Sequence, residues 1–103
     1  MTIYCFDIDG TIFSTEGMHY PNSLPIEDRI DRVNELYKQG HEIILFTARG
    51  TATGIDWREL TEMQLKKFGV SYNRLVFGKP NADHYIDDKG ISDTDFFSQP
   101  DTR

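Results

Sequence analysis

The sequence predicts an α/β protein with a mainly parallel sheet of about four strands. Short apolar segments alternate along the chain with segments of helical periodicity. Two connections between predicted strands are long enough to contain a helix, as crossovers between parallel strands require. The chain has 103 residues, of which 38% are hydrophobic and 13% aromatic, a size and composition typical of one packed domain.

The N-terminal half begins with a strand. Residues 3–7 form a short apolar and aromatic run that ends at an acid, which predicts a buried strand, with Cys5 in the core. Residues 11–24 contain glycine and proline and show no clear period, which predicts a long loop. From Pro25 to Gln39 apolar residues recur at helical spacing, so we predict a helix with Pro25 in its first turn.

The next elements repeat this alternation. Residues 42–47 include four consecutive apolar residues, as expected for a parallel strand covered on both faces. Residues 57–68 are predicted to form a helix, with Asp56 as its N-cap and Gly69 after its last turn. Two further short runs, residues 74–77 and residues 84–86, are predicted strands.

The order of these elements predicts a Rossmann-like three-layer sandwich, with the sheet between helices. We expect one domain over residues 1–103, with residues 14–25 as a flap loop. Residues 92–103 are expected to form a short tail that holds at most one helical turn, near Phe96.

The charge excludes some partners. The chain carries 17 Asp and Glu against 11 Lys and Arg, a formal net charge of −6, and has no run rich in Lys and Arg. Binding to nucleic-acid phosphates needs clustered cations, so neither nucleic acid nor an anionic membrane surface is an expected partner. The N-terminal residues lack the basic and apolar regions of a signal peptide, and the single cysteine fits a reducing compartment, so we expect a cytoplasmic protein.

Chemically active side chains follow the predicted strands. Because the carboxyl ends of parallel strands meet at one edge of a sheet, where open α/β folds bind ligands, these side chains should converge. Side chains two apart on extended backbone point the same way, so Asp7 and Asp9 should face a common site. The candidate residues are Asp7, Asp9, Thr47, Ala48, Arg49, Lys79, Asp87 and Asp88.

Four of these candidates are carboxylates, which would repel one another. One pair about 4 Å apart costs about 4 kcal/mol at an effective dielectric constant of 20, so a cation should lie among them. Oxygen ligands without nearby Cys or His favour Mg²⁺ that keeps some waters and takes a substrate phosphate oxygen.

The ordered motifs resemble the haloacid dehalogenase superfamily of phosphohydrolases. The DxDGT signature occupies residues 7–11, the second-motif threonine is Thr47, the third-motif lysine is Lys79, and the acidic pair is Asp87 and Asp88. The resemblance covers roughly residues 3–90. The TARG segment and the spacing of GKP and YIDD look most similar to small capless phosphatases associated with capsule or polysaccharide biosynthesis.

This resemblance implies roles for the first motif. Asp7 would be the nucleophile that forms an aspartyl-phosphate, and Asp9 would protonate the leaving oxygen and later deprotonate the attacking water. Superfamily dehalogenases and phosphorylating ion pumps lack the second acid, so the presence of Asp9 implies a phosphatase.

The resemblance also implies the remaining ligands. Mg²⁺ would be held by Asp7, the Asp9 backbone carbonyl, and Asp87 binding directly or together with Asp88 through water. Thr47 and the Ala48 amide would bind phosphoryl oxygens, and Lys79 would offset negative charge on the phosphoryl group.

Several questions stay open at this level. Arg49 would contact a second anionic group of the substrate or pair with a surface acid. The expected substrate is a sugar phosphate or another small phosphorylated metabolite; the alternative is a phosphate on a protein or nucleic-acid end. A capless site stays open to solvent, which a homo-oligomer would close. Receiver-like phospho-acceptors and non-hydrolytic metal-binding modules are alternatives from other classes.

Overall fold

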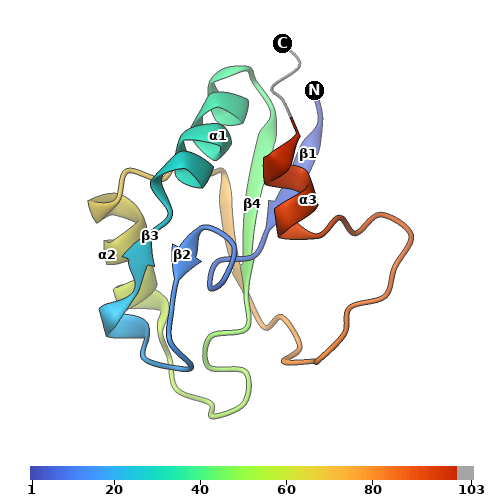
Figure 1. Cartoon of the computed structure of the whole chain (residues 1–103). Coiled ribbons are helices and arrows are strands. Elements are labelled where there is room, and N and C mark those ends of the chain that lie inside the picture. Colours follow the sequence, from blue (N-terminus) through green and yellow to red (C-terminus); the bar gives the residue numbers. More distant parts are fainter. Residues whose placement is uncertain (100–103) are drawn as a thin grey trace.

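The computed structural model describes residues 1–99 of the chain. Its main sheet has three parallel strands in the order β1, β4, β5 (Figure 1). The α/β class and the absence of an inserted cap domain are confirmed for these residues. The elements are β1 (Ile3–Phe6), β2 (Phe13–Ser14), the 3₁₀ turn η1 (Tyr20–Asn22), β3 (Leu24–Pro25), α1 (Glu27–Lys38), β4 (Glu42–Thr47), α2 (Arg58–Lys67), β5 (Arg74–Phe77) and α3 (Asp93–Ser98).

The predicted flap has more order than a loop. Strands β2 and β3 pair in an antiparallel ladder in which Phe13 lies opposite Pro25. The pairing removes Pro25 from the first turn of α1, where the sequence places it, and the helix begins two residues later. Ser23 and Tyr20 within this segment are buried, so the base of the flap is part of the folded body.

Helix α2 follows the predicted signal at its C-terminal end but not at its N-terminal end. The Asp56 carboxylate accepts the backbone N–H of Arg58 at 3.0 Å, but the helix begins at Arg58 and its N-cap is Trp57, which makes no side-chain cap bond. After the helix, Gly69 has a φ of +70°, and the Val70 N–H donates to the Leu65 carbonyl at 2.9 Å. The predicted C-terminal cap is therefore confirmed, whereas the N-cap is Trp57 and not Asp56.

The helices pack against one face of the sheet. Side chains of α1 and α2 join those of β1 and β4 in a single core, and the Phe96 ring of α3 lies 5.5 Å from the Phe6 ring. Both crossovers step in the same direction across the sheet, from β1 to β4 to β5. Right-handed crossovers of this kind put their helices on one face, so the expected covering of both faces is not found in residues 1–99.

The opposite face of the sheet is partly open. Ile3 is 58% exposed and Cys5 is also exposed, although the sequence placed Cys5 in the core. Alternate residues of β1 point to opposite faces, and Tyr4 and Phe6 take the side that α3 covers. Cys5 therefore points to the side that no helix covers in the described part of the chain.

The fourth predicted strand, residues 84–86, does not form. Residues 80–92 are all exposed, and Ile86 is 94% exposed. The Tyr85 hydroxyl instead bonds within its own segment, donating to the Pro80 carbonyl and accepting from the Ala82 N–H. A strand of three residues would make few hydrogen bonds to a neighbouring strand, and the hydrogen bonds of the Tyr85 hydroxyl within the segment take their place. The segment forms a long excursion that leaves β5 and returns at α3 (Figure 1).

The tail contains a helix longer than the predicted single turn. The Ser92 hydroxyl caps α3 by accepting the Asp95 N–H at 3.3 Å, and Arg29 of α1 pairs with Asp93 at 2.7 Å. Residues 100–103 of the predicted tail lie outside the described residues. Among the helices of residues 1–99, none is long and apolar enough to cross a membrane.

Candidate active site

A tight loop after β1 holds the two acids of the first motif. The Ile8 carbonyl accepts the N–H groups of Thr11, Ile12 and Phe13 at 2.9 to 3.1 Å. Gly10 has a φ of +83°, a conformation that favours glycine, and its N–H donates to the Phe13 carbonyl at 2.7 Å. The chain therefore turns back immediately after β1, with its acids at the carboxyl end of the strand.

Asp7 is paired with Lys79. The Lys79 Nζ lies 3.5 Å from Asp7 Oδ1, and the two side chains are 19% and 29% exposed. The N–H of Lys79 donates to the Thr47 carbonyl at 3.1 Å, which ties the lysine to the end of β4. Lys79, which follows β5, therefore contacts residues at the ends of both β1 and β4. The sequence predicts this meeting of strand ends.

Burial changes the acidity of Asp7. Desolvation is the largest influence and raises the pKa of this carboxyl above its ordinary value, and the nearby Asp9 charge raises it further. Lys79 and the Ile8 N–H act in the opposite direction. A partly desolvated carboxylate beside a cation is a suitable nucleophile, because little water must leave before it attacks.

Asp9 has a different partner. Its carboxylate receives two parallel hydrogen bonds from Arg49, Nε to Oδ2 and Nη2 to Oδ1, both at 2.8 Å. The Thr15 hydroxyl, at the base of the flap, donates to Asp9 Oδ1 at 2.6 Å. Asp7 and Asp9 are therefore neighbours in the chain whose carboxylates are held by separate cations.

Arg49 lies inside the protein, with a side chain that is 0% exposed. Besides Asp9, its guanidinium donates to Thr61 Oγ1 at 3.0 Å, Gln64 Oε1 at 2.7 Å and Ser23 Oγ at 3.3 Å. A guanidinium has five N–H donors, and these five bonds use all of them. Neither expected role of Arg49, contact with a substrate anion or with a surface acid, fits this burial.

The loop after β4 is organised by Thr47. Its hydroxyl accepts the Arg49 N–H at 3.1 Å, and the residue is 1% exposed. Gly50 then has a φ of +81°, and a side-chain carbon added there would overlap the Ile55 carbonyl oxygen. Ala48 is partly exposed between these buried anchors. The loop is therefore compact, and Ala48 is the more accessible of the two predicted phosphate-binding residues.

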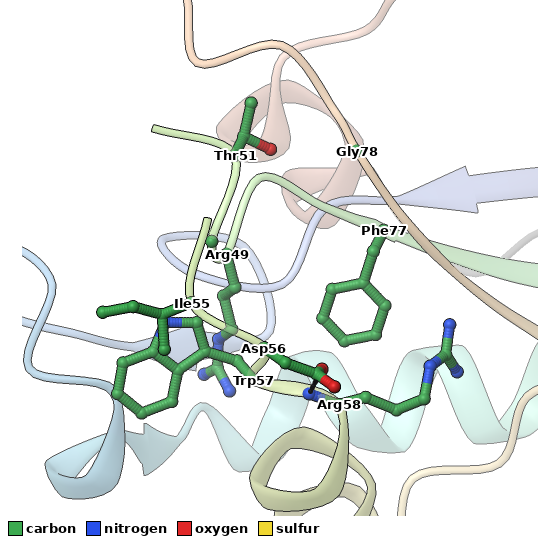
Figure 2. A pocket seen from close by; sticks show the side chains of 9 residues that line it. Arg49, Thr51, Ile55, Asp56, Trp57, Arg58, Phe77 and Gly78 are labelled. Carbon is green, nitrogen blue, oxygen red and sulfur yellow. Dashed lines mark hydrogen bonds between the residues drawn. The ribbon is translucent and has the colours of Figure 1, made fainter. Parts of the chain in front are cut away.

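A pocket of about 240 Å³ opens beside this loop, at the carboxyl ends of β4 and β5. Figure 2 shows the Trp57 and Ile55 side chains on one side and the Phe77 ring with the Arg58 guanidinium on the other. The guanidinium carbon of Arg58 lies 4.7 Å from the centre of the Phe77 ring. Gly78, which directly precedes Lys79, also lines the pocket, but Asp7 and Lys79 are not among its lining residues.

The structure does not bring Asp87 and Asp88 to the other acids. Both lie in the exposed segment, and Asp87 Oδ1 accepts the N–H groups of Lys89 and Gly90 at 2.6 Å. Within residues 1–99 no group of three or more His, Cys, Asp or Glu side chains is arranged to hold a metal ion. The predicted convergence therefore includes Asp7, Asp9, Thr47 and Lys79 but not the acidic pair.

Sequence reasoning missed the polar side chains that surround Arg49. Thr61 and Gln64 are buried polar residues on α2, and they share the helix face that carries Trp57 and Phe68. Polar residues at apolar positions of a helix need buried partners, so this pattern signals an internal polar network. Thr15 in the flap gives no comparable signal.

Comparison with known proteins supports the fold. No protein-family model matches the chain, and no curated protein sequence matches it. A structural-genomics target from Vibrio cholerae has a crystal structure that matches with a TM-score of 0.86 and 31% identity, over 97% of this chain and 90% of that one.

Two further solved structures share the fold at lower identity. The Pnkp1/Rnl/Hen1 complex matches with a TM-score of 0.61 and 23% identity, over 82% of this chain and 30% of that chain. The D,D-heptose 1,7-bisphosphate phosphatase from B. bronchiseptica, complexed with magnesium and phosphate, matches with a TM-score of 0.58 and 17% identity, over 81% and 53%. The chain spans less than two thirds of either. The chain belongs to the same family as the Vibrio cholerae protein, and it shares its fold with the B. bronchiseptica phosphatase.

Proposed function

We propose that the protein is a phosphomonoester hydrolase that acts through an aspartyl-phosphate on Asp7. The observation that carries the proposal is the pair of acids at the end of β1, one beside a lysine and one beside an arginine. Two carboxylates in different environments can take different roles, one as nucleophile and one in proton transfer.

The proposed reaction has two displacements. Asp7 attacks phosphorus, the bond from phosphorus to the ester oxygen breaks, and Asp9 gives a proton to the leaving alcohol. Water then attacks the phosphorus of the aspartyl-phosphate, Asp9 accepts its proton, and the bond to Asp7 breaks to release phosphate. Lys79 offsets the negative charge that gathers between Asp7 and the phosphoryl group.

Mg²⁺ is the proposed cofactor, and the B. bronchiseptica phosphatase with the same fold carries magnesium and phosphate. The described arrangement does not fit a magnesium site as it stands, because Asp87 and Asp88 lie in the exposed segment and, within residues 1–99, do not form a metal-binding group with the other acids. No step above is therefore assigned to the metal. If Asp87 is a ligand, Mg²⁺ should slow hydrogen exchange of residues 83–88, and Asp87→Asn should abolish that effect.

The proposed substrate is a sugar phosphate or another small phosphorylated metabolite. The pocket at the carboxyl ends of β4 and β5 combines the Phe77 ring with the half-exposed Arg58 guanidinium. Such walls suit a compact polar group with some apolar surface. Phosphates on protein or nucleic-acid ends are the alternative, and the net charge of −6 counts against nucleic acid. Closure of the open site by a second copy of the chain remains a prediction.

The test is hydrolysis of p-nitrophenyl phosphate and a panel of sugar phosphates, with Mg²⁺ or with EDTA. Asp7→Asn should remove activity while keeping the fold, and Asp31→Asn, an exposed acid on α1, is the matched control. Phosphate binding without hydrolysis of any substrate would indicate a binding module instead. A long-lived adduct formed from acetyl phosphate would indicate a receiver-like phospho-acceptor.

A further inference from the structure

We propose that Arg49 is a positioning residue that fixes the Asp9 carboxylate so that one oxygen, Oδ2, transfers the proton. The inference rests on the proposed hydrolase function and adds to it a specific geometry. It also replaces the substrate contact that the sequence suggests for Arg49, because the guanidinium is buried and has all five donors in use.

The hydrogen bonds of Asp9 leave one position open. An ionised carboxylate has about four acceptor positions, two on each oxygen. Oδ1 accepts from both Arg49 Nη2 and the Thr15 hydroxyl, so its two positions are taken. Oδ2 accepts from Arg49 Nε alone among the described residues. The free position on Oδ2 is therefore where a proton can be held, and the Asp9 side chain as a whole is 23% exposed.

The guanidinium that sets this geometry is itself fixed from two sides. Thr61 and Gln64 hold it from α2, and Ser23 holds it from the base of the flap. The Gln64 side chain also donates to the Tyr20 carbonyl at 2.6 Å, and the Tyr20 ring lies 4.8 Å from the guanidinium carbon. Helix α2 and the flap thus determine jointly where Asp9 points.

The substitution Arg49→Lys can test the positioning role of Arg49. A lysine keeps the positive charge but cannot make the two parallel hydrogen bonds of a guanidinium. A guanidinium holds both carboxylate oxygens at once, whereas an ammonium is a point charge that cannot fix the rotation of the carboxylate. In Arg49→Lys, Asp9 keeps a cationic neighbour. The two parallel hydrogen bonds that fix the orientation of its carboxylate, and with it the direction of Oδ2, are lost.

The readout depends on the leaving group. An alkyl phosphate expels a strongly basic alkoxide and needs proton donation, whereas p-nitrophenolate leaves without much help. General acid catalysis typically contributes 10² to 10⁴-fold. We expect Arg49→Lys to lower kcat/KM for an alkyl phosphate by about 100-fold and kcat/KM for p-nitrophenyl phosphate less than about 5-fold. We use kcat/KM because it reports the steps up to the first displacement. After that displacement both substrates give the same phospho-enzyme, so later steps do not depend on the leaving group.

The experiment compares wild type, Arg49→Lys and Arg74→Lys on both substrates, with thermal unfolding of each. Arg74 is the control because it is exposed and is the first residue of β5, at the end of the strand away from the site. Equal losses of kcat/KM on both substrates would overturn the inference in favour of a purely structural role. A rise in KM shared by both substrates would restore the role in substrate binding.

A second variant covers the case in which Arg49→Lys does not fold. Thr15→Val removes the hydroxyl that holds Oδ1 and leaves the guanidinium pair intact. Thr15→Val should lower kcat/KM for the alkyl phosphate about 5 to 10-fold more than kcat/KM for p-nitrophenyl phosphate. That ratio is within the usual range for the loss of one hydrogen bond. Loss that is equal on the two substrates would overturn the inference. Inactivity of the wild type on every ester would refute the proposed function itself.

Discussion

The Asp9–Arg49 pair should contribute to the stability of the fold, and a double-mutant cycle can measure how much. The variants are Asp9→Asn, Arg49→Met and the two combined. Each single change leaves one charged partner behind, whereas the double variant removes both charges from the interior. The coupling is the difference between the effect of the double variant and the combined effects of the singles.

The magnitudes follow from burial. Removing one partner of a buried ion pair typically costs about 3 to 5 kcal/mol. Asp9→Asn leaves a guanidinium that is 0% exposed, so we expect about 4 kcal/mol. Arg49→Met leaves a carboxylate that is 23% exposed and can be partly hydrated, so we expect about 3 kcal/mol. The double variant should be about as unstable as Asp9→Asn, which gives a coupling energy of about 3 kcal/mol.

The assay is urea unfolding of all four proteins, monitored by circular dichroism. A control cycle uses Arg58 and Glu62, whose charged atoms are 3.8 Å apart and whose side chains are 48% and 53% exposed. That pair should couple by less than about 0.5 kcal/mol, because it is exposed and four residues apart on one helix. A coupling energy below about 1 kcal/mol for Asp9–Arg49 would refute the argument from burial.

Two further outcomes follow from the geometry. Lys79→Met should move the acidic limb of the pH profile of kcat/KM to higher pH: Lys79 lowers the raised pKa of Asp7, and without the lysine the nucleophile stays protonated up to a higher pH. An unmoved limb would contradict the pairing. Gly50→Ala should destabilise the protein by more than about 2 kcal/mol, since a strained φ alone costs about 1 to 2 kcal/mol and the new carbon overlaps the Ile55 carbonyl. Gly54→Ala, at a φ of +76° with nothing within 4 Å, is the control and should lose only the cost of strain.

Local signals predicted most elements of the fold. Strands β4 and β5 have the predicted bounds, and α2 ends at the glycine cap that the sequence carries. The strand expected at residues 84–86 does not form, because strand formation depends on more than the local sequence. A run of three residues becomes a strand only if another strand pairs with it, and that pairing is not written in the run itself.

The candidate site was predictable where it depended on strand ends. Asp7 and Lys79 meet because two parallel strands stop at the same edge, which an alternation of strands and helices already implies. The partner of Asp9 was not predictable in the same way. Arg49 reaches it by turning inward, and this direction depends on buried acceptors contributed by α2 and the flap, whose side-chain packing no local pattern encodes.

The open face of the sheet gives the chain a built-in attachment point for a probe. Cys5 is the single cysteine of the chain, and it is exposed. It precedes Asp7 by two residues, so on extended backbone the two side chains point to the same side. Partial burial, together with the charge of Asp7, raises the pKa of the thiol, so the reactive thiolate is scarce at neutral pH and maleimide coupling should accelerate in alkaline buffer. A fluorophore attached there would report binding near the nucleophile without any substitution in the protein.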